Sequence, residues 1–228
     1  MKEIESIPPH VRRLGEMREV LYDQGFAALA DPALPVYQVY RDVPFSRPNP
    51  SLSLTELRYD VTLIPPMSLG AECPRTYGHY HSAGPGGVTY AEIYEVLQGT
   101  MHLLIQRTER DAVAEVRLIE GHPGDKVVVP PSHGHVLINP GDVLLATGNL
   151  ISRRCGADYE IWRRRRGGAY YELKKSGFVK NPIYGNVPEM KQEPCRSRFP
   201  KNLRLTELLS SNRDDFRFLV DPLSYEQN

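Results

Sequence analysis

Three histidines and one glutamate in the middle of the chain have the types and the spacing to bind a metal ion. His79 and His81 are separated by one residue, and alternate side chains of a strand share a face, so this pair points the same way. The Gly-rich loop after them contains Pro85 and allows the chain to reverse, which brings Glu92 beside the pair. We expect a third imidazole from His135, just before another strand.

This donor set predicts one divalent transition metal. Three neutral ring nitrogens and one carboxylate, with coordination positions left open, suit iron, manganese, nickel or zinc better than calcium or magnesium. Such a site supports Lewis-acid chemistry. The His-x-His pair taken alone is equally consistent with two histidines that face solvent or satisfy core hydrogen bonds, so the surrounding spacing has to decide.

The residues around the four candidate ligands have a two-part spacing. Gly99 follows Glu92 by seven positions, and Gly124 is followed at six, eleven and fifteen positions by Pro130, His135 and Asn139. This spacing resembles the two motifs of the cupin superfamily.

Two departures from the cupin pattern are visible. Ten residues separate His81 from Glu92, where many cupins have fewer, and Ser132 stands where the second motif often has glycine. The longer loop is tolerated, because closing a loop costs little free energy per added residue.

Within that superfamily the chain is similar to the cupin-type glucose-6-phosphate isomerases. The residues that carry the similarity are Thr76, Gly78, His79, His81, Glu92, Tyr94, Pro130, Pro131, His135 and Asn139. The resemblance spans roughly residues 57 to 159. It implies a jelly-roll homodimer that interconverts glucose 6-phosphate and fructose 6-phosphate, a step of glycolysis and gluconeogenesis.

The resemblance also implies roles for individual residues. Glu92 is a metal ligand first and a base second, and Tyr94 is a second candidate catalytic residue. The family's phosphate-contacting positions are matched by Thr62, Thr76, Gly78 and Tyr159. A threonine on a strand is also an ordinary sheet former, and such tyrosines are often packing residues. The sequence leaves open whether hydrogen moves through an enediol or by a direct hydride shift.

Two other functions share the same ligands. A cupin oxygenase would use iron to activate dioxygen, and a non-catalytic sugar-binding cupin would typically be joined to a helix-turn-helix, of which the sequence shows no sign. Phosphate-binding residues and turnover without oxygen would distinguish the isomerase.

The composition excludes several classes of partner. Lys plus Arg and Asp plus Glu both number 28, so no global charge attracts nucleic acid or an anionic membrane. The run Arg163 to Arg166 is interpreted as solvated surface. We see no secretion signal and no apolar run that spans a bilayer, and three widely spaced cysteines form no disulfide framework, so we expect a cytoplasmic protein.

The pattern of apolar residues predicts an all-β fold, a cupin jelly-roll barrel with an N-terminal helix and an extended C-terminal tail. We expect an amphipathic helix over residues 11–30, and a short helix near residues 203–209. The predicted strands are residues 57–63, 88–97, 100–106, 112–119, 126–129, 135–138, 143–147, 159–163 and 170–173. The expected divisions are 1–53 for the helix and a proline-rich connection, 54–173 for the barrel, and 174–228 for the tail.

Overall fold

The computed structural model describes residues 4–44 and 56–225. The strands are β1 (His10–Arg13), β2 (Pro35–Tyr40), β3 (Leu57–Ile64), β4 (Tyr80–His81), β5 (Glu92–Gln98), β6 (Met101–Glu109), β7 (Ala112–Gly121), β8 (Lys126–Val129), β9 (His133–Ile138), β10 (Leu145–Ser152), β11 (Ala157–Asp158), β12 (Tyr170–Leu173), β13 (Gly177–Lys180) and β14 (Lys191–Pro194). The α-helices are α1 (Gln24–Leu29), α2 (Glu160–Arg164) and α3 (Leu205–Ser211), and the 3-10 helices are η2 (Leu14–Glu16), η3 (Arg18–Val20), η4 (Pro85–Gly87), η5 (Pro182–Tyr184), η6 (Asp214–Leu219) and η7 (Pro222–Ser224).

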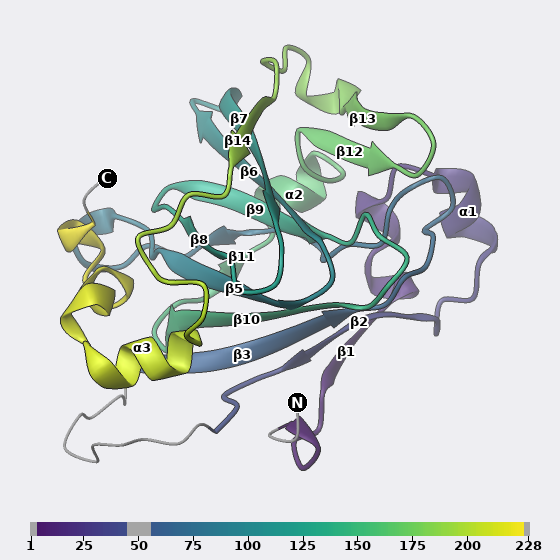
Figure 1. Ribbon diagram of the computed structural model, residues 1–228. Helices are drawn as coiled ribbons and strands as arrows, with labels where there is room; N and C mark the ends of the chain where they lie inside the picture. Colours follow the sequence, from purple (N-terminus) through teal and green to yellow (C-terminus); the bar gives the residue numbers. More distant parts are fainter. Residues whose placement is uncertain (1–3, 45–55, 226–228) are drawn as a thin grey trace.

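Two sheets form the layers of the fold (Figure 1). A six-stranded antiparallel sheet has the order β1-β2-β3-β10-β5-β8, and a four-stranded sheet has the order β14-β7-β6-β9. The largest cluster of buried apolar side chains includes residues of both sheets, such as Val96 and Val127 of the first and Leu103 and Leu137 of the second. The predicted all-β cupin fold is confirmed, and the barrel is open rather than closed. Among the described residues, no helix is long and apolar enough to cross a membrane.

The N-terminal prediction of one helix over residues 11–30 is mostly wrong. Residues 10–13 form β1, which pairs with β2 at the edge of the large sheet, and only α1 is α-helical. Leu14 and Val20 are buried in the two 3-10 helices between them, and Met17 is buried at the turn that joins those helices. Their spacing of three matches the 3.0 residues per turn of a 3-10 helix, so the apolar period was shorter than the one we expected.

Two predicted strands also differ from the structure. Residues 159–163 belong largely to α2, whose Trp162 is fully buried while the flanking arginines stay outside, as one face of a helix requires. The strand predicted over 143–147 is β10, which runs on to Ser152. The short helix expected near 203–209 is confirmed as α3. Strands β2, β13 and β14 were not predicted.

The C-terminal tail packs on the outer face of the large sheet, with α3 beside β10 (Figure 1). The Nζ of Lys126 donates to the carbonyls of Pro200 at 2.8 Å and Leu203 at 2.5 Å. The buried carboxylate of Glu95 accepts from Arg204 Nε at 3.1 Å and from the Leu205 backbone amide at 3.0 Å. Charge-assisted bonds therefore tie the tail to β8 and β5.

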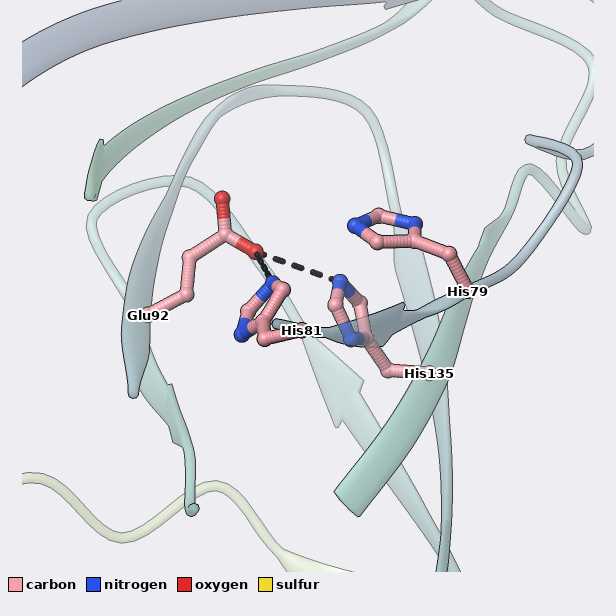
Figure 2. Close-up of side chains that lie close together, drawn as sticks. All are labelled: His79, His81, Glu92 and His135. Atoms are coloured by element: carbon pink, nitrogen blue, oxygen red, sulfur yellow. Dashed lines mark ion pairs between the residues drawn. The ribbon is translucent and has the colours of Figure 1, made fainter. Parts of the chain in front are cut away.

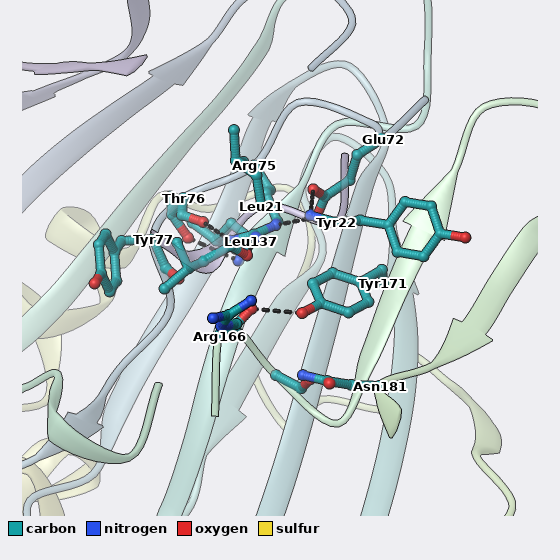
Figure 3. A network of polar contacts seen from close by, with 12 residues as sticks. Leu21, Tyr22, Glu72, Arg75, Thr76, Tyr77, Leu137, Arg166, Tyr171 and Asn181 are labelled. Carbon is teal, nitrogen blue, oxygen red and sulfur yellow. Dashed lines mark hydrogen bonds and ion pairs between the residues drawn. The ribbon is translucent and has the colours of Figure 1, made fainter. Parts of the chain in front are cut away.

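A buried ion pair joins the N-terminal segment to the chain that precedes the histidines (Figure 3). Arg75 Nε donates to Glu72 Oε1 at 2.5 Å, and both side chains are at most 4% exposed. The other oxygen of Glu72 accepts from the Tyr22 amide at 2.9 Å, and Arg75 also donates to the carbonyls of Val20, Thr76 and Tyr77. The pair therefore fixes η3 against residues 72–77.

Replacing one partner of this pair should be strongly destabilising. Glu72→Gln keeps the shape of the side chain but leaves the Arg75 guanidinium buried without its counter-charge, so we expect a loss of about 3–5 kcal/mol in the free energy of unfolding. The matched control is Glu189→Gln, whose partner Lys180 is exposed; it should cost less than about 1 kcal/mol. Urea denaturation measures both, and equal losses would contradict the assignment.

His102 on β6 lies between two carboxylates. Its Nδ1 is 2.8 Å from Glu172 Oε2 on β12, and its Nε2 is 3.1 Å from Glu120 Oε2 on β7. Burial lowers the pKa of His102, but the hydrogen bonds and charge of Glu172, with those of Glu120, outweigh it and raise the pKa above 6.5. The charged imidazole thus links β12 to the four-stranded sheet.

The stability that His102 contributes should be lost on raising the pH. Because the folded pKa exceeds the unfolded one, the contribution is complete below about pH 6.5 and disappears as the pH rises through the folded value. In urea denaturation, the difference in stability between the wild type and His102→Gln should therefore narrow as the pH is raised from about pH 6. A difference between the two proteins that does not change with pH would contradict this.

Candidate metal centre and substrate cavity

The four predicted ligands meet where the two sheets approach each other (Figure 2). His81 is on β4, and His79 comes just before it and pairs with His135 on β9 through backbone hydrogen bonds of 3.1 and 2.9 Å. Glu92 begins β5 in the opposite sheet. One ligand atom from each residue lies within 4.8 Å of those from the others. Pairing of distant strands thus brings together residues that are 56 positions apart in sequence.

Glu92 is the centre of the cluster. Its Oε2 is 3.2 Å from His135 Nε2 and 3.3 Å from His81 Nε2, while its Oε1 accepts from Asn149 Nδ2 at 2.6 Å. The Nδ1 of His81 is 2.9 Å from the Tyr90 carbonyl, which requires a proton on Nδ1 and leaves the lone pair on Nε2. Asn149 and Tyr90 thereby orient the carboxylate and the imidazole of two candidate ligands.

The cluster holds its residues in the protonation states that metal binding needs. Burial, together with the neighbouring imidazoles of His135 and His81, lowers the pKa of His79 well below 6.5, and burial also lowers that of His135. Burial disfavours a charge on Glu92, but the close contacts with the imidazoles of His135 and His81 outweigh it and hold the carboxyl pKa well below 4.5. Neutral His79 and His135 beside an ionised carboxylate are ready to bind a cation.

The pattern of unsatisfied atoms fits a bound ion. Among the described residues, His81 Nε2 and Glu92 Oε2, which lie 3.3 Å apart, are buried without a hydrogen-bond partner. A buried polar atom without a partner costs about 1–3 kcal/mol, so two such atoms facing each other need an explanation. A divalent cation bound to His79, His81, Glu92 and His135 would use lone pairs of this cluster and offset its negative charge.

Gly78 lets the first histidine reach the cluster. Its φ of +83° lies in the region that favours glycine, and a Cβ there would overlap the Trp162 indole. Trp162 therefore packs directly on the backbone before His79. The Ser132 that departs from the cupin motif has a φ of +65°, which explains why glycine is common at this position.

A cavity of about 180 Å³ opens beside the cluster. Its walls contain all the residues predicted to contact substrate, together with three of the four candidate ligands: Thr62, Thr76, Gly78, Tyr94, Tyr159, His79, His81 and Glu92. The Tyr94 hydroxyl is 3.1 Å from His135 Nε2. The predicted substrate contacts and the metal cluster thus share one space.

Sequence reasoning missed several residues of this cavity. Asn149 was overlooked because the predicted strand ended at residue 147, although strand alternation from Thr147 points Asn149 to the same face. Arg41 and Arg58 also line the cavity, and both pair with the buried Asp60, at 3.1 and 2.9 Å. The local pattern around Arg58 and Asp60 predicted a strand and gave no sign of a cavity.

His133, which stands two residues before His135 and so forms another His-x-His pair, lies outside the candidate metal cluster, as does the run Arg163 to Arg166. The Nδ1 of His133 is 2.7 Å from the Pro131 carbonyl. Arg163 pairs with Glu19, Arg164 pairs with Asp111, and Arg165 donates to a backbone carbonyl. Three of the four arginines in the run are therefore engaged within the chain.

Comparisons with known proteins agree with this geometry. The family model of glucose-6-phosphate isomerase (GPI) matches residues 11–189. The chain belongs to this family. The glucose-6-phosphate isomerase of Thermococcus litoralis is 32% identical over 158 residues, which cover 68% of this chain and 76% of the relative. That of Pyrococcus furiosus is 31% identical over 179 residues, covering 78% and 87%. Residues 190–225, which form much of the tail, lie outside the family match.

Solved structures show more distant similarity. A sugar phosphate isomerase of the cupin superfamily from Silicibacter pomeroyi is 14% identical, with a TM-score of 0.38 over 77% of this chain and 88% of that one. The oxalate decarboxylase of Lactobacillus farciminis is 13% identical, with the same TM-score over 78% of this chain.

Removing one ligand should remove metal. We expect His135→Ala to lower the bound metal at least about tenfold after dialysis, because a ligand bond is lost from a buried site. His133→Ala, two residues away on the same strand but outside the cluster, is the matched control and should keep its metal. Elemental analysis of both purified variants decides, and a full metal complement in His135→Ala would contradict the ligand assignment.

Proposed function

We propose that this member of the glucose-6-phosphate isomerase family is a metal-dependent aldose–ketose isomerase that interconverts glucose 6-phosphate and fructose 6-phosphate. The observation that carries the proposal is the buried cluster of three imidazoles and one carboxylate on the wall of a cavity with hydroxyl donors. The family match supports the reaction type. The ligands would be His79, His81, Glu92 and His135, and the ion one of iron, manganese, nickel or zinc.

When bound, the ion would act as a Lewis acid that polarises the substrate oxygens on C1 and C2. The chain's own residues supply the rest. The Glu92 carboxylate is ionised, fixed by Asn149 and within reach of the cavity, so it can accept a proton from a substrate carbon or oxygen as well as bind the ion. Its second role requires that the carboxylate be only loosely held by the ion.

Tyr94 is suited to hold a proton next to the substrate. Its buried hydroxyl lines the cavity beside His135. Burial, with the negative charge of Glu92, raises the pKa of Tyr94 well above 10, so the phenol stays protonated at neutral pH. A neutral phenol donates a hydrogen bond to a substrate oxygen on which negative charge develops.

The phosphate would occupy the part of the cavity lined by Thr62, Thr76, Gly78 and Tyr159. Thr76 Oγ1 already accepts from the Leu137 amide at 3.1 Å, which leaves the hydroxyl hydrogen free to donate. Several neutral donors around a dianion give geometric specificity, and each contributes a charge-assisted hydrogen bond.

Metal replacement tests the proposal. The purified protein is stripped with chelator, reloaded separately with iron, manganese, nickel or zinc, and assayed for conversion of fructose 6-phosphate to glucose 6-phosphate. We expect negligible turnover without metal and at least about a hundredfold recovery with one of the four ions, because Lewis-acid stabilisation contributes several kcal/mol.

Matched assays separate the alternatives. Turnover that is unchanged in oxygen-free buffer favours an isomerase over an iron oxygenase, and mannose 6-phosphate tests the identity of the sugar. Glucose 6-phosphate deuterated at C2 tests the route of the hydrogen. Loss of the deuterium to solvent indicates an enediol, whereas its retention at C1 of fructose 6-phosphate indicates a hydride shift. No isomerisation of any sugar phosphate with any metal would overturn the proposal.

A further inference from the structure

Arg12 on β1 is a cation that lies next to the cavity. The proposed catalytic steps assign no role to this arginine. Its side chain is 18% exposed, and its Nε–H is buried without a hydrogen-bond partner within residues 4–44 and 56–225. Its carboxylate neighbour is Glu16, at 3.2 Å, but Glu16 is 44% exposed, so water screens that pair. Glu16 therefore offsets only part of the charge of Arg12, and the rest can act on groups inside the protein.

Three tyrosines connect Arg12 to the cavity. The guanidinium carbon lies 5.6 Å from the ring centre of Tyr77 and 5.7 Å from that of Tyr159, within the range of a cation–π contact. The hydroxyls of Tyr37 and Tyr159 also interact electrostatically with Arg12. Tyr37, Tyr77 and Tyr159 all line the cavity, whereas Arg12 does not, so the guanidinium lies directly behind this wall.

The sheet register places Arg12 at the end of the cavity where the phosphate is expected. Arg12 pairs with Tyr37 across β1 and β2, and Val39, two residues further, pairs with Thr62 on β3. Tyr37 therefore lies between Arg12 and β3, and Arg12 is two residues along the sheet from the level of Thr62. Tyr159 reaches the same wall from α2's N-terminus, through its edge-on contact with Tyr77 at 5.1 Å between ring centres.

The two arginines that line the cavity, Arg41 and Arg58, are less suited to this end. Arg58 is four residues from Thr62 on β3, which is roughly 13 Å along the strand. Arg41 and Arg58 also share the carboxylate of the buried Asp60, so part of their charge is neutralised. Of these three arginines, Arg12 alone has a cation–π contact with Tyr159 and lacks a buried counter-charge among the residues that the structure describes.

We propose that Arg12 gives the cavity its preference for a phosphorylated over a neutral sugar. Its charge attracts the phosphate through the tyrosine wall, and its contacts hold the Tyr37 and Tyr159 hydroxyls at the phosphate subsite. Arg12 is thus a positioning residue, since it acts through the tyrosines and touches none of the reacting atoms. The inference rests on the proposed function for its substrate.

The test compares two neighbouring arginines in the metal-loaded enzyme. We expect Arg12→Met to raise KM for fructose 6-phosphate about tenfold or more with kcat changed less than about twofold, and to weaken binding of inorganic phosphate, measured by calorimetry, by a similar factor. Arg12→Lys, which keeps the charge, should recover part of both. The control Arg13→Met removes an exposed arginine that donates to the Ala33 carbonyl at 2.7 Å, and should match the wild type.

Each outcome decides something. Unchanged phosphate binding in Arg12→Met, or an equal loss in Arg13→Met, would overturn the inference, as would a fall in kcat with unchanged KM. A merely structural Arg12 would lower the melting temperature without changing phosphate affinity. If Arg12→Met does not fold, Arg12→Gln and Arg12→Lys are titrated with inorganic phosphate instead.

The failure of this inference can be told from the failure of the proposed function. A wild type that binds phosphate but isomerises no sugar phosphate would refute the proposed function alone, whereas one that binds no phosphate would overturn the role of Arg12.

Discussion

The meeting of three imidazoles and one carboxylate at the junction of two sheets, with all but His79 buried, is the constraint on which the rest of the structure depends. Oxygen and nitrogen lone pairs are removed from water there and left without hydrogen-bond partners, which a core does not tolerate without compensation. A bound cation offers that compensation. The fold therefore has to deliver ligands from both layers to within a few ångströms and keep them there when no ion is bound.

The two faces of strand β5 make different contacts, and both help to hold the cluster in place. Glu92 and Tyr94 point into the cavity, while Ile93 packs beneath the C-terminal tail and Glu95 binds its residues 204–205. Alternation along a strand makes this division automatic. Most of the tail lies beyond the region matched by the family model, and it braces β5 from outside, so its charges bear on the stability of the candidate site without lining the cavity.

The N-terminal segment braces the opposite side of the site. The buried pair of Glu72 and Arg75 fixes η3 against the residues that lead to Gly78, and β1 brings Arg12 behind the tyrosine wall. Charges are thus placed around the cavity at a distance from the metal cluster. This separation lets the cluster itself remain a set of neutral imidazoles around one carboxylate, while cations behind the walls can favour an anionic substrate.

The local pattern of the chain determined the strands of the central region and the identity of the four candidate ligands. Alternating residues 57–63 predicted β3, because strand alternation is a short-range period, whereas the shared site of His79, Glu92 and His135 was predicted from a motif spacing that resembles the cupin superfamily. Four further residues of the cavity were predicted from family resemblance rather than from periodicity: Thr62, Thr76, Gly78 and Tyr159. The structure places all four in the lining of one cavity.

Only the tertiary structure decided which distant groups support that site. The pairing of β1 with β2 overrode the helical appearance of residues 11–30, and the register of β1 on β2 brought Arg12 opposite Tyr37 of the cavity wall. Likewise, Asn149 became a partner of Glu92 through strand pairing. The local sequence pattern indicates on which face of its own strand or helix a residue lies. The partner that this face contacts depends on long-range strand pairing, which no local pattern encodes.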